Sequence, residues 1–182
     1  SPLGVYGQTK AAGDIAVGNC PKHYIVRSSW VIGEGKNFVR TMALLSDRCA
    51  DPSDGLNQVT VVDDQLGRLT FTEDMAKGIF LLLGYREGDA EPSEPCEFGT
   101  YNLTNSGRVA SWAEIAAKVF ELKNDNADAV VPVSTADYYA SAGGPISPRP
   151  TSSALSLCRI VGVGYLPRDW EHSLFEYMDT NE

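Results

Sequence analysis

The chain has 182 residues, of which 43% are hydrophobic and 21% charged, and its formal net charge is −9. This composition is typical of a globular protein, and no stretch approaches the ~18 uninterrupted apolar residues of a membrane-spanning helix. The negative charge would repel a phosphate backbone, which argues against nucleic acid as a partner. The first six residues have neither the basic start nor the apolar run of a signal peptide, so we expect a cytoplasmic protein.

Helix and strand signals alternate along the chain, which predicts an α/β fold with much of its sheet parallel. The first half is expected to contain a helix over residues 6–17, a strand over 23–27, a helix capped by Asn37, a strand over 59–62 and a helix from Thr72 with the acids Glu73 and Asp74 at its positive end. After a solvated connection over 85–98, we expect a strand over 99–103, a helix opened by the capping box Ser111–Glu114, an edge strand over 130–133, an irregular stretch over 138–150 and an amphipathic helix over about 169–178.

The four cysteines do not indicate a metal site. Cys20, Cys49, Cys96 and Cys158 are far apart and form no C-x-x-C pair, and the chain has only two histidines. We therefore predict reduced thiols and no bound metal.

Tyr6-Gly7-Gln8-Thr9-Lys10 is the first segment whose residues indicate chemistry. Residues four apart lie on one face of a helix, so the Tyr6 phenol and the Lys10 ammonium can address the same small volume. A neighbouring cation stabilises a phenolate, which helps a tyrosine to exchange a proton near neutral pH. Tyr6 can therefore serve as a general acid, although the same spacing also occurs where the two residues only pack.

Further motifs follow this segment in a fixed order. They are Val26-Arg27-Ser28-Ser29-Trp30-Val31-Ile32-Gly33, Asn37-Phe38-Val39, Val61-Val62-Asp63-Asp64-Gln65-Leu66-Gly67, Gly99-Thr100-Tyr101-Asn102, Ser106-Gly107 with Ser111-Trp112, and Arg149-Pro150-Thr151-Ser152-Ser153-Ala154-Leu155. Together with Tyr-x-x-x-Lys, the set resembles the dTDP-4-dehydrorhamnose reductases of the extended short-chain dehydrogenase/reductase superfamily over essentially the whole chain. Two positions depart from the family pattern: Leu69 stands where Pro is usual, and Ser156 stands where an acid often occurs.

The resemblance implies the remainder of a Rossmann-like NAD(P)-binding fold plus a small α/β substrate-binding domain, with the amino-terminal dinucleotide-binding half absent. Residues 1–33 would be the end of the Rossmann-like domain with the catalytic helix. Residues 34–182 would be mainly the substrate-binding domain, with some elements returning to the Rossmann-like sheet. Gly33-Glu34-Gly35 is not expected to be a cofactor loop, because Phe38 stands where the third small residue of the dinucleotide fingerprint belongs.

The implied reaction is reduction of the C4 ketone of a dTDP-linked 4-keto-6-deoxyhexose to complete dTDP-L-rhamnose, with NADPH as the usual hydride donor and NADH as the alternative. By the resemblance, Tyr6 would deliver the proton, and Lys10 would assist it and hold the nicotinamide ribose, so both also belong to the cofactor site. The chain alone is expected to be inactive and to bind no cofactor. Its partners would be the sugar nucleotide and the missing Rossmann half, and exposed apolar surface would favour a homo-oligomer.

Four residues are candidates for the substrate. Trp30 could pack on the sugar or base, Asn37 could cap a helix whose amides hold phosphate, Gln65 could contact a nucleotide edge, and Arg149 could pair with the diphosphate. Each has a structural alternative, namely loop packing, a simple helix cap, a solvated turn and a surface ion pair.

Two other function classes remain open. A noncatalytic regulatory or nucleotide-sugar-binding subunit could keep this fold without turnover. A sibling epimerase or dehydratase would share the Tyr-Lys chemistry, but a dehydratase needs additional acid and base residues that the sequence does not reveal.

Overall fold

The computed structural model describes residues 2–86, 88, 90–142 and 148–180. Its helices are α1 (Val5–Gly18), α2 (Phe38–Ala50), α3 (Thr72–Leu82), α4 (Trp112–Asn124), the 3-10 helix η1 (Ala127–Ala129), α5 (Thr135–Ala142), α6 (Cys158–Gly162) and α7 (Trp170–Asp179). Its strands are β1 (Tyr24–Arg27), β2 (Val31–Ile32), β3 (Val59–Val62), β4 (Leu66–Gly67), β5 (Thr70–Phe71), β6 (Gly99–Asn102), β7 (Ala110–Ser111) and β8 (Val130–Val133).

The strands form pairs, and most of the pairs are parallel. β1 pairs with β6, β2 with β5 and β3 with β8 in parallel, whereas β4 and β7 are antiparallel. The predicted α/β class with parallel pairing is therefore confirmed. In the described part of the chain β8 has β3 as its one neighbour, with Pro132 opposite Val61, so the edge position expected from Pro132 is confirmed as well.

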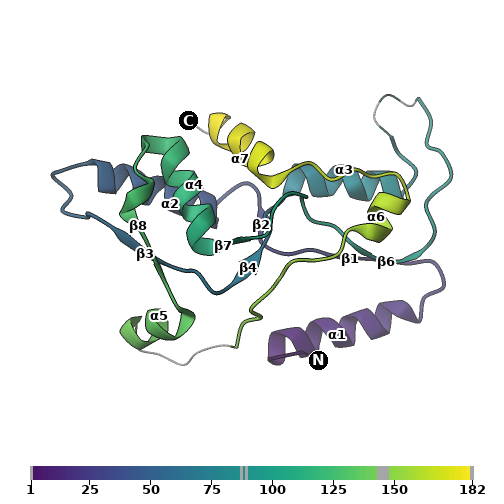
Figure 1. Cartoon of the computed structure of the whole chain (residues 1–182). Helices are drawn as coiled ribbons and strands as arrows, with labels where there is room; N and C mark the ends of the chain where they lie inside the picture. Colours follow the sequence, from purple (N-terminus) through teal and green to yellow (C-terminus); the bar gives the residue numbers. More distant parts are fainter. Residues whose placement is uncertain (1, 87, 89, 143–147, 181–182) are drawn as a thin grey trace.

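The described residues form two hydrophobic cores, and the larger lies between α2, α4, α7 and the strands beside them. Val39, Phe71, Val119, Phe120 and Trp170 are among its buried members. Helices α2 and α4 pack directly on one another, and α4 also covers β3 and β8. Removing side chains of this size from water is worth roughly 1.5–3 kcal/mol each, so this core fixes the part of the molecule drawn around α2 and α4 in Figure 1.

The smaller core lies between α3, α6 and the β1–β6 pair. Leu82, Tyr101, Leu103 and Ile160 are buried there. Because β6 follows the predicted boundary at residue 33 yet pairs with β1, at least one later element returns to the first strand. The division at residue 33 itself stays a prediction.

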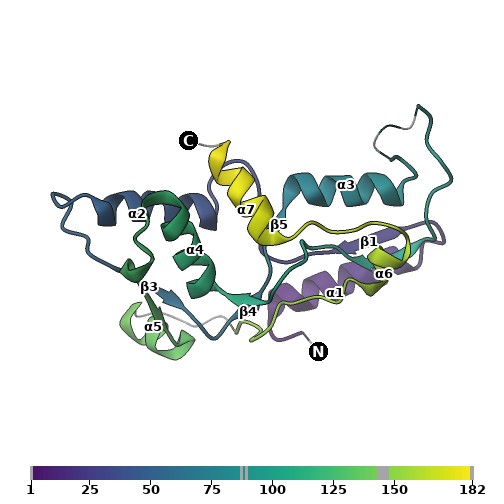
Figure 2. The same cartoon turned by 45° about the horizontal axis from the view of Figure 1, so that its top comes forward.

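Helix α1 lies against one face of the β1–β6 pair, opposite α3 (Figures 1 and 2). None of its residues is buried, and Val5, Tyr6 and Ile15 are each more than 70% exposed. Among the described residues, no helix is long and apolar enough to cross a membrane.

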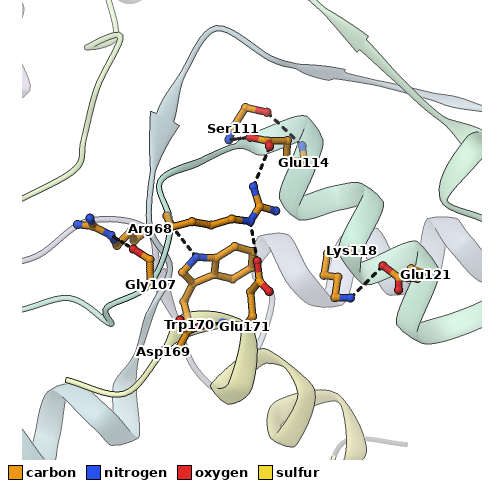
Figure 3. Close-up of polar contacts among 10 residues, drawn as sticks. Arg68, Gly107, Ser111, Glu114, Lys118, Glu121, Asp169, Trp170 and Glu171 are labelled. Carbon is orange, nitrogen blue, oxygen red and sulfur yellow. Dashed lines mark hydrogen bonds and ion pairs between the residues drawn. The ribbon is translucent and has the colours of Figure 1, made fainter. Parts of the chain in front are cut away.

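Side-chain caps open the helices that surround the larger core. The Asn37 carboxamide oxygen accepts from the Arg40 amide at the start of α2, and Ser111 and Glu114 form the predicted capping box of α4. Figure 3 shows Glu114, Trp170 and Glu171 gathered where α4 and α7 begin. The Arg108 guanidinium joins the two helices there by donating to Glu114 at 2.7 Å and to Glu171 at 2.6 Å.

The stretch 138–150, expected to be irregular, begins instead inside helix α5, so this prediction is wrong for residues 138–142. The reason is a cap: Ser134 Oγ accepts from the Asp137 amide at 3.1 Å, and the Asp137 carboxylate accepts from Ser134 Oγ at 2.6 Å. Residues 143–147 lie outside the described part of the chain. Leu69, one of the two departures from the family pattern, is fully buried in the larger core.

Candidate active site

Tyr6 and Lys10 lie together on the exposed side of α1. The Lys10 Nζ is 5.6 Å from the centre of the Tyr6 ring, and both side chains are exposed. The helix therefore produces the juxtaposition that the four-residue spacing predicts. In this arrangement the phenol can donate a proton, and the neighbouring ammonium can stabilise the phenolate that remains.

A second segment, residues 148–153, runs past the start of this helix. Pro148 Cγ lies 3.6 Å from the position that a Cβ on Gly4 would occupy, which places the exposed Arg149 near the first turn of α1. The same segment then joins β4, because the Leu66 amide donates to the Thr151 carbonyl at 2.9 Å. This segment therefore connects the start of α1 to β4, which follows Gln65, and Arg149 lies between the two contacts.

Trp30 packs between Trp112 and Gly67 of β4. Its ring stacks on Trp112 with centroids 3.8 Å apart, and a Cβ on Gly67 would come within 2.9 Å of it, so only glycine fits there. The Trp30 backbone is in the left-handed region, with φ of 49°, a conformation that costs most residues about 1 kcal/mol or more. The indole is half-buried, so both loop packing and contact with a ligand remain compatible with this position.

Gln65 and the two neighbouring acids belong to the loop after β3. Gln65 Nε2 donates to the Thr135 hydroxyl at 2.9 Å, and its carbonyl oxygen has no hydrogen bond within the described residues. Asp63 accepts from Ser111 Oγ at 2.5 Å, and Asp64 accepts from the Thr135 amide and hydroxyl. Hydrogen bonding to Thr135 lowers the pKa of Asp64. These acids therefore fix the loop to the starts of α4 and α5.

Asn37 lies apart from the residues around α1. Its amide nitrogen donates to Gly33 O at 2.8 Å, Gly35 O at 3.1 Å and the Tyr177 hydroxyl at 2.8 Å, while its oxygen caps α2. These contacts support the structural alternative for Asn37, and its predicted substrate contact stays a prediction.

The same contacts bear on the segment Gly33–Gly35. Its carbonyls point at the Asn37 amide, and Thr72 side-chain atoms would lie within 2.8 Å of a Cβ on Gly33. At the start of α2, the Asn37 side chain accepts the hydrogen bond of the Arg40 amide. The exclusion of Gly33–Gly35 as a dinucleotide loop stays a prediction.

The structure contains a cavity of about 740 Å³ that is bounded by residues 32–35, the start of α3 and α7. The sequence alone does not predict this cavity. Asp74 is its buried acid: one carboxylate oxygen accepts from Asn105 at 2.6 Å and Ser173 at 2.7 Å, and the other lies 3.6 Å from the Arg168 guanidinium. From the sequence, Asp74 is expected only to offset the helix dipole. No group of three or more His, Cys, Asp or Glu side chains among the described residues could hold a metal ion.

Comparison with known proteins decides the family. The model of the family described as "RmlD substrate binding domain" matches residues 1–182. The chain belongs to this family. It is 34% identical over 95% of its length to a dTDP-4-dehydrorhamnose reductase of Aggregatibacter actinomycetemcomitans, covering 56% of that protein. It is also 32% identical to the spore coat polysaccharide biosynthesis protein SpsK of Bacillus subtilis, with 97% of this chain and 54% of that protein covered.

Solved structures agree with this membership. A Bacillus anthracis dTDP-4-dehydrorhamnose reductase in complex with NADP is 29% identical, with a TM-score of 0.78 over 100% of this chain and 57% of its own. A Bacillus anthracis dTDP-glucose 4,6-dehydratase, at 15% identity and a TM-score of 0.66, shares the fold. The chain spans about half the length of the curated relatives it matches.

Proposed function

We propose that this chain forms the catalytic-helix and substrate-binding part of an NADPH-dependent reductase that converts dTDP-4-dehydrorhamnose to dTDP-L-rhamnose. The observation that carries the proposal is the Tyr6–Lys10 pair on the exposed face of α1, at the end of the molecule that Arg149 also approaches. Membership of the RmlD substrate binding domain family supports the sugar nucleotide as substrate.

The chain's own residues account for the proton step. As the C4 carbonyl is reduced, negative charge grows on its oxygen, and the Tyr6 hydroxyl donates the proton that neutralises it. Lys10, on the same helix face, stabilises the phenolate that Tyr6 becomes. The proposal needs no second acid, since one proton balances one hydride.

Lys10 also fits a role toward the cofactor. Its ammonium is exposed and, within the described residues, makes no ion pair, so its donors can reach ribose hydroxyls. The nicotinamide would supply the hydride when bound. The related reductase structure that contains NADP favours NADPH over NADH as the donor.

The substrate side rests on Arg149, Gln65 and Trp30. The exposed guanidinium of Arg149 would pair with the diphosphate, for which planar bidentate donors are suited. Gln65 has its amide nitrogen engaged by Thr135 and offers its carbonyl oxygen to the N–H of thymine. Trp30 would contribute the part of its indole that Trp112 and β4 leave uncovered.

The test is the Tyr6→Phe substitution in the longer protein that joins this chain to a dinucleotide-binding half. Loss of the hydroxyl should lower kcat by about 10²–10⁴-fold and leave KM for the sugar nucleotide little changed, because only the transition state loses its acid. Steady-state oxidation of NADPH with the 4-keto sugar nucleotide measures both constants. Lys10→Met should also lower kcat and additionally weaken NADPH binding.

Tyr85→Phe is the matched control, because Tyr85 is another exposed tyrosine, far from Tyr6 along the chain. It should retain the parent's turnover. A Tyr6→Phe enzyme with turnover within a few-fold of the parent would contradict the catalytic role of this residue. Absence of any reduction by the parent would favour a noncatalytic subunit.

A further inference from the structure

Asp14 is the third member of a stripe on α1 that begins with Tyr6 and Lys10. The three residues are spaced four apart, so they follow one face of the helix. The Asp14 carboxylate accepts from Arg27 Nε at 2.9 Å and from Arg27 Nη2 at 2.5 Å. Arg27 is the last residue of β1 and is followed by the short loop to Trp30.

This contact is the main polar attachment of the helix. Within residues 2–86, 88, 90–142 and 148–180, no other hydrogen bond or ion pair joins α1 to a strand, and no residue of α1 is buried. Within this chain, apolar burial therefore does little to fix the rotation or the axial position of this helix. The fork of Arg27, with two donors on one carboxylate oxygen, supplies a geometric constraint that the packing does not.

The contact also decides which cation Asp14 meets. A Lys and an acid four residues apart on a helix are close enough to pair, so Asp14 could draw the Lys10 ammonium away from Tyr6. In the structure Asp14 is engaged by Arg27, and Lys10 Nζ lies 5.6 Å from the Tyr6 ring centre. Within the described residues, Asp14 therefore pairs with Arg27 and not with Lys10.

We propose that Arg27 and Asp14 are positioning residues, which hold α1 at the end of β1 and keep Lys10 beside Tyr6. The inference rests on the proposed reductase function, because it assigns the pair an effect on the Tyr6 and Lys10 chemistry. The pair is partly exposed, at 54% for the Arg27 side chain and 30% for Asp14, so it adds little to stability by itself. Its effect should appear in turnover, which is sensitive to misplacement of about 1 Å.

The experiment compares Arg27→Gln, Asp14→Asn and the double variant in the longer reductase. Asp14→Asn removes the attachment and should lower kcat by about tenfold with little change in KM for the sugar nucleotide. Arg27→Gln removes the attachment and also frees the Asp14 carboxylate to capture Lys10, so its kcat should be lower still. The double variant should return to the level of Asp14→Asn, because the freed carboxylate is gone.

Two further measurements separate positioning from a merely structural role. Hydrogen exchange of the α1 amides should accelerate in Asp14→Asn while amides of α4 stay protected, and Asp14→Glu should restore part of the activity. Lys118→Gln, which removes the exposed Lys118–Glu121 pair of α4, is the matched control and should leave kcat unchanged.

The inference is overturned if Arg27→Gln and Asp14→Asn both keep kcat within twofold of the parent, or if the double variant is no better than Arg27→Gln. If a single variant does not fold, exchange of the two charges, Asp14→Arg with Arg27→Asp, keeps the test open, since it should restore α1 protection. Failure of the proposed function can be told apart from failure of this inference. If the proposed function fails, Tyr6→Phe keeps its turnover, whereas amide hydrogen exchange of α1 still reports whether Arg27 and Asp14 attach the helix.

Discussion

At the scale of single residues, Tyr165 shows how burial sets a proton equilibrium in this fold. Its hydroxyl donates to the Asp74 carbonyl oxygen at 2.5 Å, which connects the segment before α7 to the first turn of α3. Burial raises the pKa of Tyr165 to about 12, with the nearby Asp74 acting in the same direction. The neutral phenol is therefore the form that the folded state favours.

Tyr165→Phe should destabilise the chain by about 1 kcal/mol at neutral pH, because the partly buried hydrogen bond is lost. Since the folded pKa lies above the ordinary value of 10.0, the contribution of Tyr165 is complete below that pH and is lost as pH rises toward about 12. Urea unfolding at neutral and alkaline pH should show an alkaline loss in the parent that is smaller in Tyr165→Phe. Tyr85→Phe, at an exposed tyrosine, should behave as the parent does, and equal alkaline losses in all three proteins would contradict the prediction.

Residue contacts were predictable where the sequence spacing is short. The Tyr6–Lys10 juxtaposition follows from helical periodicity alone. The partners of Asp74 are 31 and 99 residues away along the chain, and Trp30 stacks on the distant Trp112, so no local pattern reveals these contacts. The role of Asn37 as a cap was predictable for the same reason as Tyr6–Lys10, whereas its contact with Tyr177 was not.

At the scale of elements, the capping box of α4 illustrates a local signal with a measurable charge effect. The Glu114 carboxylate accepts from the Ser111 amide at 2.7 Å, and this hydrogen bond, with help from Arg108, lowers the pKa of Glu114 although desolvation opposes it. The folded pKa lies below the ordinary 4.5, so the contribution of Glu114 is present above that pH and is lost as pH falls through the lowered folded value.

Glu114→Gln should therefore be less stable than the parent at neutral pH by about 0.5–1 kcal/mol, a value kept small because the side chain is about half exposed. The difference should shrink in acid, below the ordinary pKa of 4.5. Urea unfolding at neutral and acidic pH measures it. Glu121→Gln on the same helix removes a carboxylate that does not cap and should show a smaller difference at neutral pH; equal effects of the two substitutions would contradict the special role of the cap.

The same kind of signal explains which elements were predictable. Asn37, Ser111 and Asp169 open α2, α4 and α7 where the sequence indicates, since caps act over a single turn. The sequence does not indicate helix α5, because the Gly, Pro and Ser content after residue 138 predicts irregular structure. The opposing signal, the Ser134–Asp137 cap, involves only two residues. The pairing of β1 with β6 was expected only in general terms, because the register depends on packing across the smaller core.

At the scale of the whole molecule, the chain leaves α1, the helix that carries Tyr6 and Lys10, exposed. The larger core encloses α2, α4 and α7, whereas α1 leaves Val5 at 75% and Ile15 at 72% exposed. Relatives of this family are about twice as long as the part that matches. We therefore propose that a dinucleotide-binding half packs on α1 and on the free edge of β1, which within the described residues pairs only with β6.

This arrangement predicts that the 182-residue chain does not bind NADPH in the micromolar range. A dinucleotide gains much of its affinity from a glycine-rich turn and a helix start that hold the pyrophosphate. Here α2, α4 and α7 begin with their own side-chain caps, and the first turn of α3 carries Glu73 and Asp74, which would repel phosphate. Lys10 remains, but a single ribose contact is too weak to retain the cofactor.

Calorimetric titration of the chain with NADPH should accordingly give no measurable heat of binding under conditions in which the longer protein binds. The longer protein with Lys10→Met is the matched comparison: it should still bind, more weakly, because the pyrophosphate site is intact and only the ribose contact is lost. Micromolar binding by the 182-residue chain would mean that the phosphates are held within residues 1–182, and it would contradict the division of the site between two halves.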